Sequence, residues 1–554
     1  MSRATRIGLY SLLILITLGA VSFGLYQLKP PTPETSTASP EKFSSTRAME
    51  YLKNIAKAPH PIGSAEHTNV RSYIVSVIKK LGFNHEIQES SENNDGENRF
   101  LQNIVVRVAG NNSKHNAVMI TAHYDSVSSA PGAGDDGAGV AALLETIRAL
   151  KNTEQLNNDV IILFSDGEEA GMLGAKMFVK HRWFKDVKVV FNFEARGCSG
   201  HSIMYDSSKN NSILIREFIK ASPFPVAFSS SSDYPKSGYN DLNIYKENEI
   251  QGLVFAFNKW YFAYHTSEDN LQNISQESIQ HHGSYMLALA KHFGKIDLEN
   301  LYIKNDGDVI FFNIFRSVVV AYPETWVLPI AIIAALVFLT VICFGLRKKL
   351  ISITGITKGL LCFCISLLFI YILTSLVWKC FEIHWGEKLQ SMLKHDAISQ
   401  VYLLGFILIT CGVFSLLYVW FAKECNALEL ITAALLVWVV MMIVTSCLYK
   451  GTSYMFTWPS IFSIIGLFIL FKVRDKLIGF LVSYGLISIP TITLIAPSIY
   501  LFFIDSTLAQ VNIYMVMLSL VLGLVIPTLY IQFSKLRTLP PVVLIIIGFI
   551  LFLT

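Results

Sequence analysis

The sequence predicts an α/β domain with a mostly parallel sheet flanked by helices, followed by a polytopic α-helical transmembrane domain. Residues from 40 to 300 mix polar and apolar side chains in the way soluble globular domains do. From Trp326 to Thr554, apolar runs of about twenty residues, long enough to cross a bilayer core, alternate with short polar loops. Within the soluble part, β-rich runs alternate with helical patterns, which is typical of a parallel sheet covered on both faces.

The chain begins with an apolar stretch, residues 7–26, that follows Arg3 and Arg6. A cleaved signal peptide is the alternative interpretation, but the stretch is long and has no clear small-x-small cleavage site. We therefore expect an uncleaved transmembrane anchor over residues 1–27. Residues 28–44 are rich in Pro, Ser and Thr, a composition that predicts an extended linker.

After a domain at 45–298 and a second linker at 299–324, residues 325–554 are expected to form an eight-span transmembrane domain. With the anchor this makes nine spans, of which the last eight lie at 325–346, 357–378, 399–421, 429–449, 453–471, 477–504, 511–533 and 540–554. Pro490 and Pro497 are expected to kink the long span at 477–504 or to mark a re-entrant break in it.

The loops on one side of these spans are richer in basic residues, as in Arg347-Lys348-Lys349. By the positive-inside rule that side is cytoplasmic. The sequence thus predicts a multi-pass membrane protein with a cytoplasmic N-terminus. The domain at 45–298 is then expected on the extracytoplasmic or lumenal side.

Charge and cysteine usage exclude several kinds of site. The formal net charge is +4, but the basic residues cluster beside the spans, and the soluble part has no basic tract with interleaved aromatics, so we expect no nucleic-acid partner. Only one of the eight cysteines, Cys198, lies in the soluble part, which excludes an intradomain disulfide or a Cys-x-x-Cys zinc site. No Asp, Glu, Lys or Arg lies at the centre of a predicted span, which argues against an ion-coupled transporter.

Polar clusters follow most of the predicted strands of the soluble part. The β-rich runs lie at 103–108, 117–121, 159–164, 187–193 and 252–257, and the helical patterns at 137–151 and 277–293. The last four runs are followed in turn by His123 and Asp125, by Glu168 and Glu169, by Glu194, and by His265, while Asp135-Asp136 precedes the first helix.

These clusters together predict a metal site. In parallel sheets, ligands bind beyond the carboxyl ends of the strands. Two histidines and three or more carboxylates at that edge suit a divalent cation with nitrogen and oxygen ligands. The carboxylates exceed what one zinc ion requires, which indicates two metal ions with a shared ligand. Each cluster alone also has an ordinary explanation, such as two glutamates in a first helical turn, so the prediction depends on the joint pattern.

The motifs His-x-Asp, Gly-x-Asp-Asp-x-x-Gly, Asp-Gly-Glu-Glu-x-Gly, Asn-x-Glu-Ala-Arg-Gly and Tyr-His-Thr-x-x-Asp occur in this order. Over residues 45–295 the sequence resembles the two-zinc metallopeptidase family of bacterial leucyl aminopeptidases, aminopeptidase Y and glutamate carboxypeptidase. The resemblance implies a zinc-dependent exopeptidase fold of the phosphorylase/hydrolase-like type. The overall layout also resembles the vacuolar membrane protease and the endoplasmic-reticulum metallopeptidase, which join such a domain to a multi-span C-terminal half.

Residue by residue, the resemblance implies two zinc ions per chain. Asp135 would bridge them. His123 and Glu194 would complete one zinc site, and Glu169 and His265 the other.

Four further residues receive roles from the same resemblance. Glu168 would be the general base, and Asp125 would hydrogen-bond the far nitrogen of His123 and so fix its tautomer. Arg196 would contact a substrate carboxylate or peptide carbonyl, with a structural salt bridge as the alternative. Asp136 is expected to be structural.

The activity implied is removal of N-terminal residues from peptides, in which a zinc-bridging hydroxide attacks and Glu168 transfers the proton to the leaving amine. The expected partners are a peptide substrate and the lipid bilayer. Three alternatives remain: a non-catalytic receptor or adaptor on the same fold, a glutaminyl cyclase, and a transporter with a peptidase attached.

Overall fold

The computed structural model divides the chain into two compact units, one of residues 28–324 and one of residues 1–27 together with 325–554. Each unit has a hydrophobic core of its own. The structure describes all residues except 1–2, 95–96, 113, 230–239, 304–306, 317, 387–388, 390–395, 422, 474–475, 534–538 and 554.

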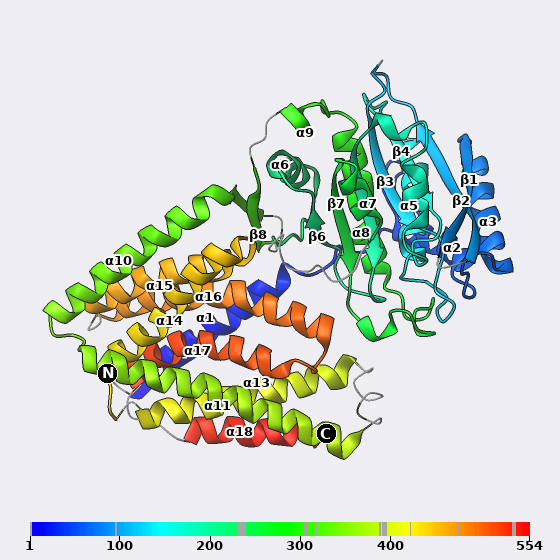
Figure 1. Cartoon of the computed structure of the whole chain (residues 1–554). Helices are drawn as coiled ribbons and strands as arrows, with labels where there is room; N and C mark the ends of the chain where they lie inside the picture. The colour runs from blue at the N-terminus through cyan, green and yellow to red at the C-terminus, as the bar shows by residue number, and fades with distance from the viewer. Residues whose placement is uncertain are drawn as a thin grey trace. The chain divides into compact units, whose positions relative to one another are not determined.

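A seven-stranded sheet forms the centre of the unit of residues 28–324 (Figure 1). Its strands are β1 (His85–Asn94), β2 (Glu97–Val108), β3 (Ala117–His123), β4 (Asp159–Ser165), β5 (Val187–Ala195), β6 (Ile203–Ser207) and β7 (Gln251–Phe257). Their order is β1-β2-β4-β3-β5-β7-β6. The central strands β4, β3, β5 and β7 run parallel, while β1, β2 and β6 make antiparallel pairs at the two edges. The predicted fold class, a mostly parallel sheet flanked by helices, is confirmed.

Helices cover both faces of this sheet. They are α2 (Ser45–Ile55), α3 (Ala65–Leu81), α4 (Gly137–Leu150), α5 (Leu173–Phe178), α6 (Ser212–Ala221), α7 (Asp241–Glu247), α8 (Gln276–Phe293) and α9 (Asn300–Ile303). In β3, Val118 and Ile120 pack into the cluster that contains α4 and α8, whereas Ala117 and Met119 pack into the cluster that contains α5 and α7. Because successive side chains of a strand point to opposite faces, burial on both faces requires an uninterrupted apolar run.

The five predicted β-rich runs lie in β2, β3, β4, β5 and β7, and the two predicted helical patterns lie in α4 and α8. The edge strands β1 and β6 were not predicted. The sequence of β1, HEIQESSENN, is polar over most of its length. It pairs with β2 along the whole strand, so the neighbouring strand rather than a buried face determines its conformation.

The unit is larger than the predicted domain of residues 45–298. Residues 28–44 contain no helix or strand, but the Glu34 N–H donates to Gln280 Oε1 at 2.9 Å, and Phe43 is buried against α8. In place of the predicted linker at 299–324, α9 is followed by a hairpin of β8 (Val309–Phe315) and β9 (Val318–Pro323). Phe311 and Val319 of this hairpin belong to the core of the unit, which explains why the segment is folded.

In the second unit, the secondary structure of the described residues is entirely helical. Its helices longer than one turn are α1 (Arg3–Tyr26), α10 (Val327–Arg347), α11 (Ile353–Trp385), α13 (Asp396–Phe421), α14 (Ala427–Leu448), α15 (Tyr454–Val473), α16 (Leu477–Ser506), α17 (Val511–Phe533) and α18 (Leu539–Leu551). Among the described residues, eight helices are long and apolar enough to cross a membrane, and the ninth, α18, is shorter. Since α16 continues through Pro490 and Pro497, the structure has no re-entrant break at these prolines.

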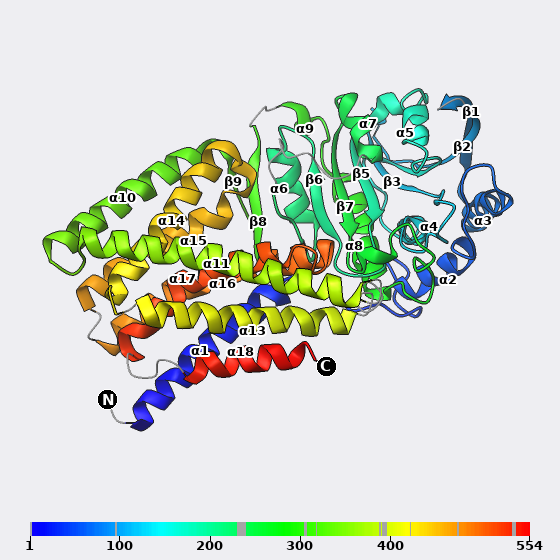
Figure 2. The ribbon, with the colours of Figure 1, turned by 60° about the horizontal axis from the view of Figure 1, so that its bottom comes forward.

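Helix α1 packs against α16, nearly five hundred residues away in the sequence (Figure 2). Thr17 Oγ1 lies 2.6 Å from the Tyr484 hydroxyl oxygen, a hydrogen-bond distance. Leu9 and Leu13 are buried in the same core as the C-terminal helices. The N-terminal helix is therefore part of the helical unit rather than a separate segment.

Candidate active site

The predicted site residues gather at the carboxyl edge of the parallel strands. His123 is the last residue of β3 and pairs in register with Ser165, the last residue of β4. Glu194 lies near the end of β5. The other predicted residues lie in loops that follow strands: Asp125 and Asp135 after β3, Glu168 and Glu169 after β4, Arg196 after β5, and His265 after β7.

Five of these residues form two groups, each able to hold a metal ion. His123, Asp135 and Glu194 form one group, and Asp135, Glu169 and His265 form the other. In the first, His123 Nε2 lies 3.2 Å from Asp135 Oδ1 and 3.7 Å from Glu194 Oε2. In the second, His265 Nε2 lies 3.2 Å from Asp135 Oδ2 and 3.0 Å from Glu169 Oε1. Asp135 thus presents one oxygen to each histidine.

The donor atoms fit divalent metal ions. The groups consist of imidazole nitrogens and carboxylate oxygens, the ligands that zinc accepts in sites without cysteine. Glu169 Oε1 is buried and, although it is near His265, has no hydrogen bond of acceptable geometry among the described residues. Buried carboxylate oxygens are normally satisfied. A buried carboxylate oxygen without a hydrogen bond, such as Glu169 Oε1, is expected in a site where a bound cation would be its partner.

Asp125 holds both His123 and the loop after β4. The His123 Nδ1–H donates to the backbone carbonyl of Asp125 at 3.0 Å, and the Asp125 carboxylate is farther away, at 3.5 Å. Nε2 is therefore the nitrogen of His123 that faces the metal group. The carboxylate also accepts backbone N–H groups from Gly167, Glu168 and Glu169, at 2.9, 3.1 and 3.3 Å. The predicted orienting role thus involves the backbone of Asp125, and its carboxylate has a second role in the loop.

Asp269 positions Asp135, a role that the sequence motifs alone did not assign. Its buried carboxylate accepts the N–H of Gly134 at 2.6 Å and that of Asp135 at 3.1 Å. Because Gly134 and Asp269 are far apart in the sequence, only the tertiary structure shows this contact. The only available signal was the last position of the Tyr-His-Thr-x-x-Asp motif.

Asp136, next to the shared ligand, begins α4. Its carboxylate accepts the Gly139 N–H at 3.1 Å, as an N-cap residue does. The peptide bond between Asp135 and Asp136 is cis.

Carboxylates dominate the electrostatics of the site. Burial raises the pKa of Glu194 to about 8, and burial followed by repulsion from Glu194 raises the pKa of Glu168 well above its usual value. Burial alone would also raise the pKa of Asp135, but hydrogen bonds from His123 and His265 lower it to about 2. A bound cation reverses the repulsion among such carboxylates.

Glu168 and Arg196 belong to neither metal group. Glu168 is half-buried, and its charge interacts with Glu194 and Asp135, which places it beside the groups. Arg196 is also half-buried, and its charge interacts with Tyr205, Tyr264 and Glu194. Its contact with substrate stays a prediction.

Residues 103–290 match the family model described as Peptidase family M28. The chain is 32% identical over 286 residues to the vacuolar membrane protease of Candida albicans, an alignment that covers 50% of this chain and 34% of that protein. It is 28% identical over 309 residues to endoplasmic reticulum metallopeptidase 1 of Homo sapiens, covering 51% and 34%. These alignments span about a third of the relatives' length.

Two solved structures are similar to about half of the chain. A zinc aminopeptidase from Bacillus subtilis matches with a TM-score of 0.39 and 16% identity, covering 46% of this chain and 96% of that one. A glutaminyl cyclase from Porphyromonas gingivalis matches with a TM-score of 0.37 and 18% identity, covering 44% and 96%. The family match contains every predicted site residue and confirms the resemblance: residues 103–290 of this chain are similar to peptidase family M28.

Proposed function

We propose that this chain is a membrane-anchored zinc-dependent peptidase that removes N-terminal residues from peptides. It would bind two zinc ions, with Asp135 between them, His123 and Glu194 on one, and Glu169 and His265 on the other. The observation that carries the proposal is the position of Asp135, whose two carboxylate oxygens each lie 3.2 Å from a different histidine. A carboxylate that serves two cations is typical of two-metal hydrolytic sites.

When bound, zinc ions at these positions would supply Lewis acidity to the scissile carbonyl and to the attacking water. Glu168 would take a proton from that water and donate it to the leaving amine. Asp125 supports this role because its carboxylate accepts the backbone N–H groups of Glu168 and Glu169. The same side chain thus positions the proposed base, Glu168, and the proposed ligand, Glu169. Asp269 would hold the shared ligand in place from the opposite loop.

The proposal is tested on the full chain, purified in detergent, by metal analysis and hydrolysis of aminoacyl-nitroanilides. We expect two zinc ions per chain. The Glu168→Gln variant should keep its zinc and lose at least a hundredfold in kcat, since general-base catalysis contributes on the order of 10² to 10⁴ in rate. Glu247→Gln, at an exposed position of α7, is the matched control and should leave kcat unchanged.

Other outcomes would favour the alternatives. A chain that holds no zinc, or a Glu168→Gln variant with full activity, would favour a non-catalytic receptor or adaptor. Release of ammonia from N-terminal glutamine without release of an amino acid would indicate glutaminyl cyclisation. Uptake of peptide into vesicles by a variant that cannot hydrolyse it would favour transport.

We also propose that the unit of residues 28–324 lies on the extracytoplasmic or lumenal side and that the N-terminus is cytoplasmic. The support is the excess of basic residues, such as Arg347, on the opposite side of the spans. Protease treatment of sealed vesicles with the cytoplasmic face outward should remove an N-terminal tag and spare this unit. Digestion of the unit instead would contradict the orientation.

A further inference from the structure

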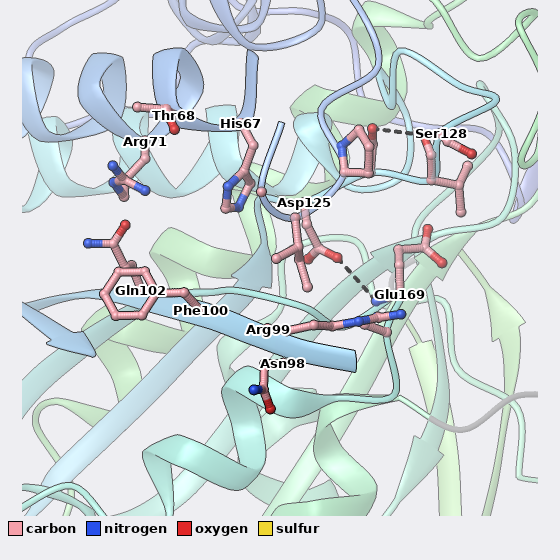
Figure 3. A pocket seen from close by; sticks show the side chains of 16 residues that line it. His67, Thr68, Arg71, Asn98, Arg99, Phe100, Gln102, Asp125, Ser128 and Glu169 are labelled. Carbon is pink, nitrogen blue, oxygen red and sulfur yellow. Dashed lines mark hydrogen bonds between the residues drawn. The ribbon is translucent and has the colours of Figure 1, made fainter. Parts of the chain in front are cut away.

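A cavity of about 720 Å³ opens beside the candidate active site (Figure 3). Asp125 and Glu169 line one part of it, and the rest is lined by residues of α3, of β2 and of the loops at 61–63 and 126–128. Glu169 is also a member of the second metal group. The cavity therefore borders the second metal group, and its size is in the range of small-ligand sites, about 300–1,000 Å³.

Its two acidic side chains belong to the candidate active site. The Asp125 carboxylate accepts three backbone N–H groups, and Glu169 faces His265 in the metal group. Two arginines, Arg71 and Arg99, line the same cavity. Arg71 lies at the end of the cavity away from Glu169, so a positive charge stands at that end (Figure 3).

Arg71 is the arginine available to a ligand. Within the part of the chain that the structure describes, it makes no hydrogen bond or ion pair. Arg99 lies opposite Glu92 in the pairing of β1 with β2. A guanidinium group offers five donors in a planar fork that matches a carboxylate, so a half-buried arginine without a protein partner is suited to an anionic ligand.

The first turns of α3, which carry Arg71, are tied to the loop that carries Glu168 and Glu169. The Ser64 hydroxyl caps the helix by accepting the His67 N–H at 3.1 Å. The His67 ring places Nε2 2.8 Å from Asp166 Oδ1 and stacks on Tyr124, with 4.9 Å between ring centroids. Arg71 follows His67 by four residues and lies on the same helix face. The cavity wall is thus held against the residues that precede the proposed base.

We propose that this cavity binds a carboxylate of the peptide substrate through Arg71, with Arg99 adding positive charge. The inference rests on the proposed peptidase function and extends it to substrate preference. The carboxylate has three possible sources in a peptide: the side chain of the N-terminal residue, the side chain of the following residue, or the free C-terminus. Each predicts a different preference among otherwise identical substrates.

Matched peptide pairs distinguish these sources in the zinc-loaded full chain. The pairs are Glu-Ala-amide with Gln-Ala-amide, Leu-Glu-amide with Leu-Gln-amide, and Leu-Ala with Leu-Ala-amide. In one pair, kcat/KM should be roughly tenfold to a hundredfold higher for the peptide with the carboxylate, the range expected for a charged hydrogen bond. That pair identifies the source.

Arg71→Gln should abolish this preference and leave kcat/KM for the neutral peptide of the pair nearly unchanged. Arg71→Lys should keep part of the preference, because lysine retains the charge but not the planar fork. Arg216→Gln, at an exposed position of α6 outside the cavity, is the control and should behave as the unaltered chain.

Equal cleavage of both members of every pair would overturn the inference while leaving the peptidase function intact. A preference that survives Arg71→Gln would also overturn it, since another group would then bind the carboxylate. If no peptide is cleaved, the proposed function fails and the inference fails with it.

Discussion

Replacing Asp269 with asparagine should weaken metal binding while leaving the chain folded. The Asp269 carboxylate is 1% exposed and accepts two backbone N–H groups, from Gly134 at 2.6 Å and from Asp135 at 3.1 Å. An asparagine amide has only one acceptor oxygen. The backbone N–H of either Gly134 or Asp135 would then face the NH₂ group of the asparagine, another donor. The segment that carries the shared ligand, Asp135, would move to avoid this contact.

The size of the effect follows from the hydrogen bond that asparagine cannot accept. A hydrogen bond to a charged group contributes about 1.5–3 kcal/mol, and each 1.4 kcal/mol corresponds to about a tenfold change in affinity. The metal-free chain can relax around the altered side chain, whereas the metal-bound chain needs Asp135 in place. Most of the loss should therefore appear in metal binding, as a zinc Kd raised by about tenfold to a hundredfold, as is usual for residues that support ligands.

The assay is competition for zinc between the full chain and a chelator of known affinity, together with thermal unfolding of the metal-free chain. Asp206→Asn is the matched control: Asp206 is also buried and ion-paired, to Lys246 at 2.6 Å, but it lies on β6 outside the metal groups. The control should lower the unfolding temperature without changing zinc affinity. If Asp269→Asn lowers stability but leaves the zinc Kd unaltered, Asp269 does not position Asp135.

Two further predictions concern the stability of the unit of residues 28–324. Gly283→Ala should destabilise it by about 1–3 kcal/mol in denaturant unfolding, because a Cβ there would overlap the Phe43 ring, and no change would show that residues 28–44 do not pack on α8. Burial lowers the pKa of His281 to about 4, and the neutral ring accepts the Ser202 N–H and donates to the Phe224 carbonyl. Since the unfolded state then binds more protons, stability should fall as pH decreases from 6.5 toward 4, by about 1.4 kcal/mol at pH 5.5. His281→Gln should reduce that slope, and an unaltered slope would contradict the assignment.

Local pattern was sufficient to predict most of the sheet. Burial on both faces of a parallel sheet requires a continuous apolar run, and β3, β4, β5 and β7 each contain one. The length of the apolar runs was likewise sufficient for the helices of the second unit, because bilayer thickness sets that length. The polar strand β1 lacked such a signal, because its pairing with β2 rather than its own pattern stabilises it. The hairpin of β8 and β9 does contain apolar β-rich runs, VIFFNIF and VVVAYP, which the prediction of a linker at 299–324 overlooked.

The two groups of candidate metal ligands show the same division. The gathering of polar residues after the strands could be predicted because parallel strands end at one edge. The individual ligands could be named because the motifs around them resemble those of the two-zinc metallopeptidase family. Contacts between distant parts of the chain decide which Asp135 oxygen faces which histidine, the support from Asp269, and the presence of Arg71 and Glu169 in one cavity. By itself the sequence determined the central strands, the long apolar helices and the kinds of side chain in the candidate metal groups. Only the tertiary structure decided the strand order, the second role of Asp125 and the cavity, because these arise from packing that no local pattern encodes.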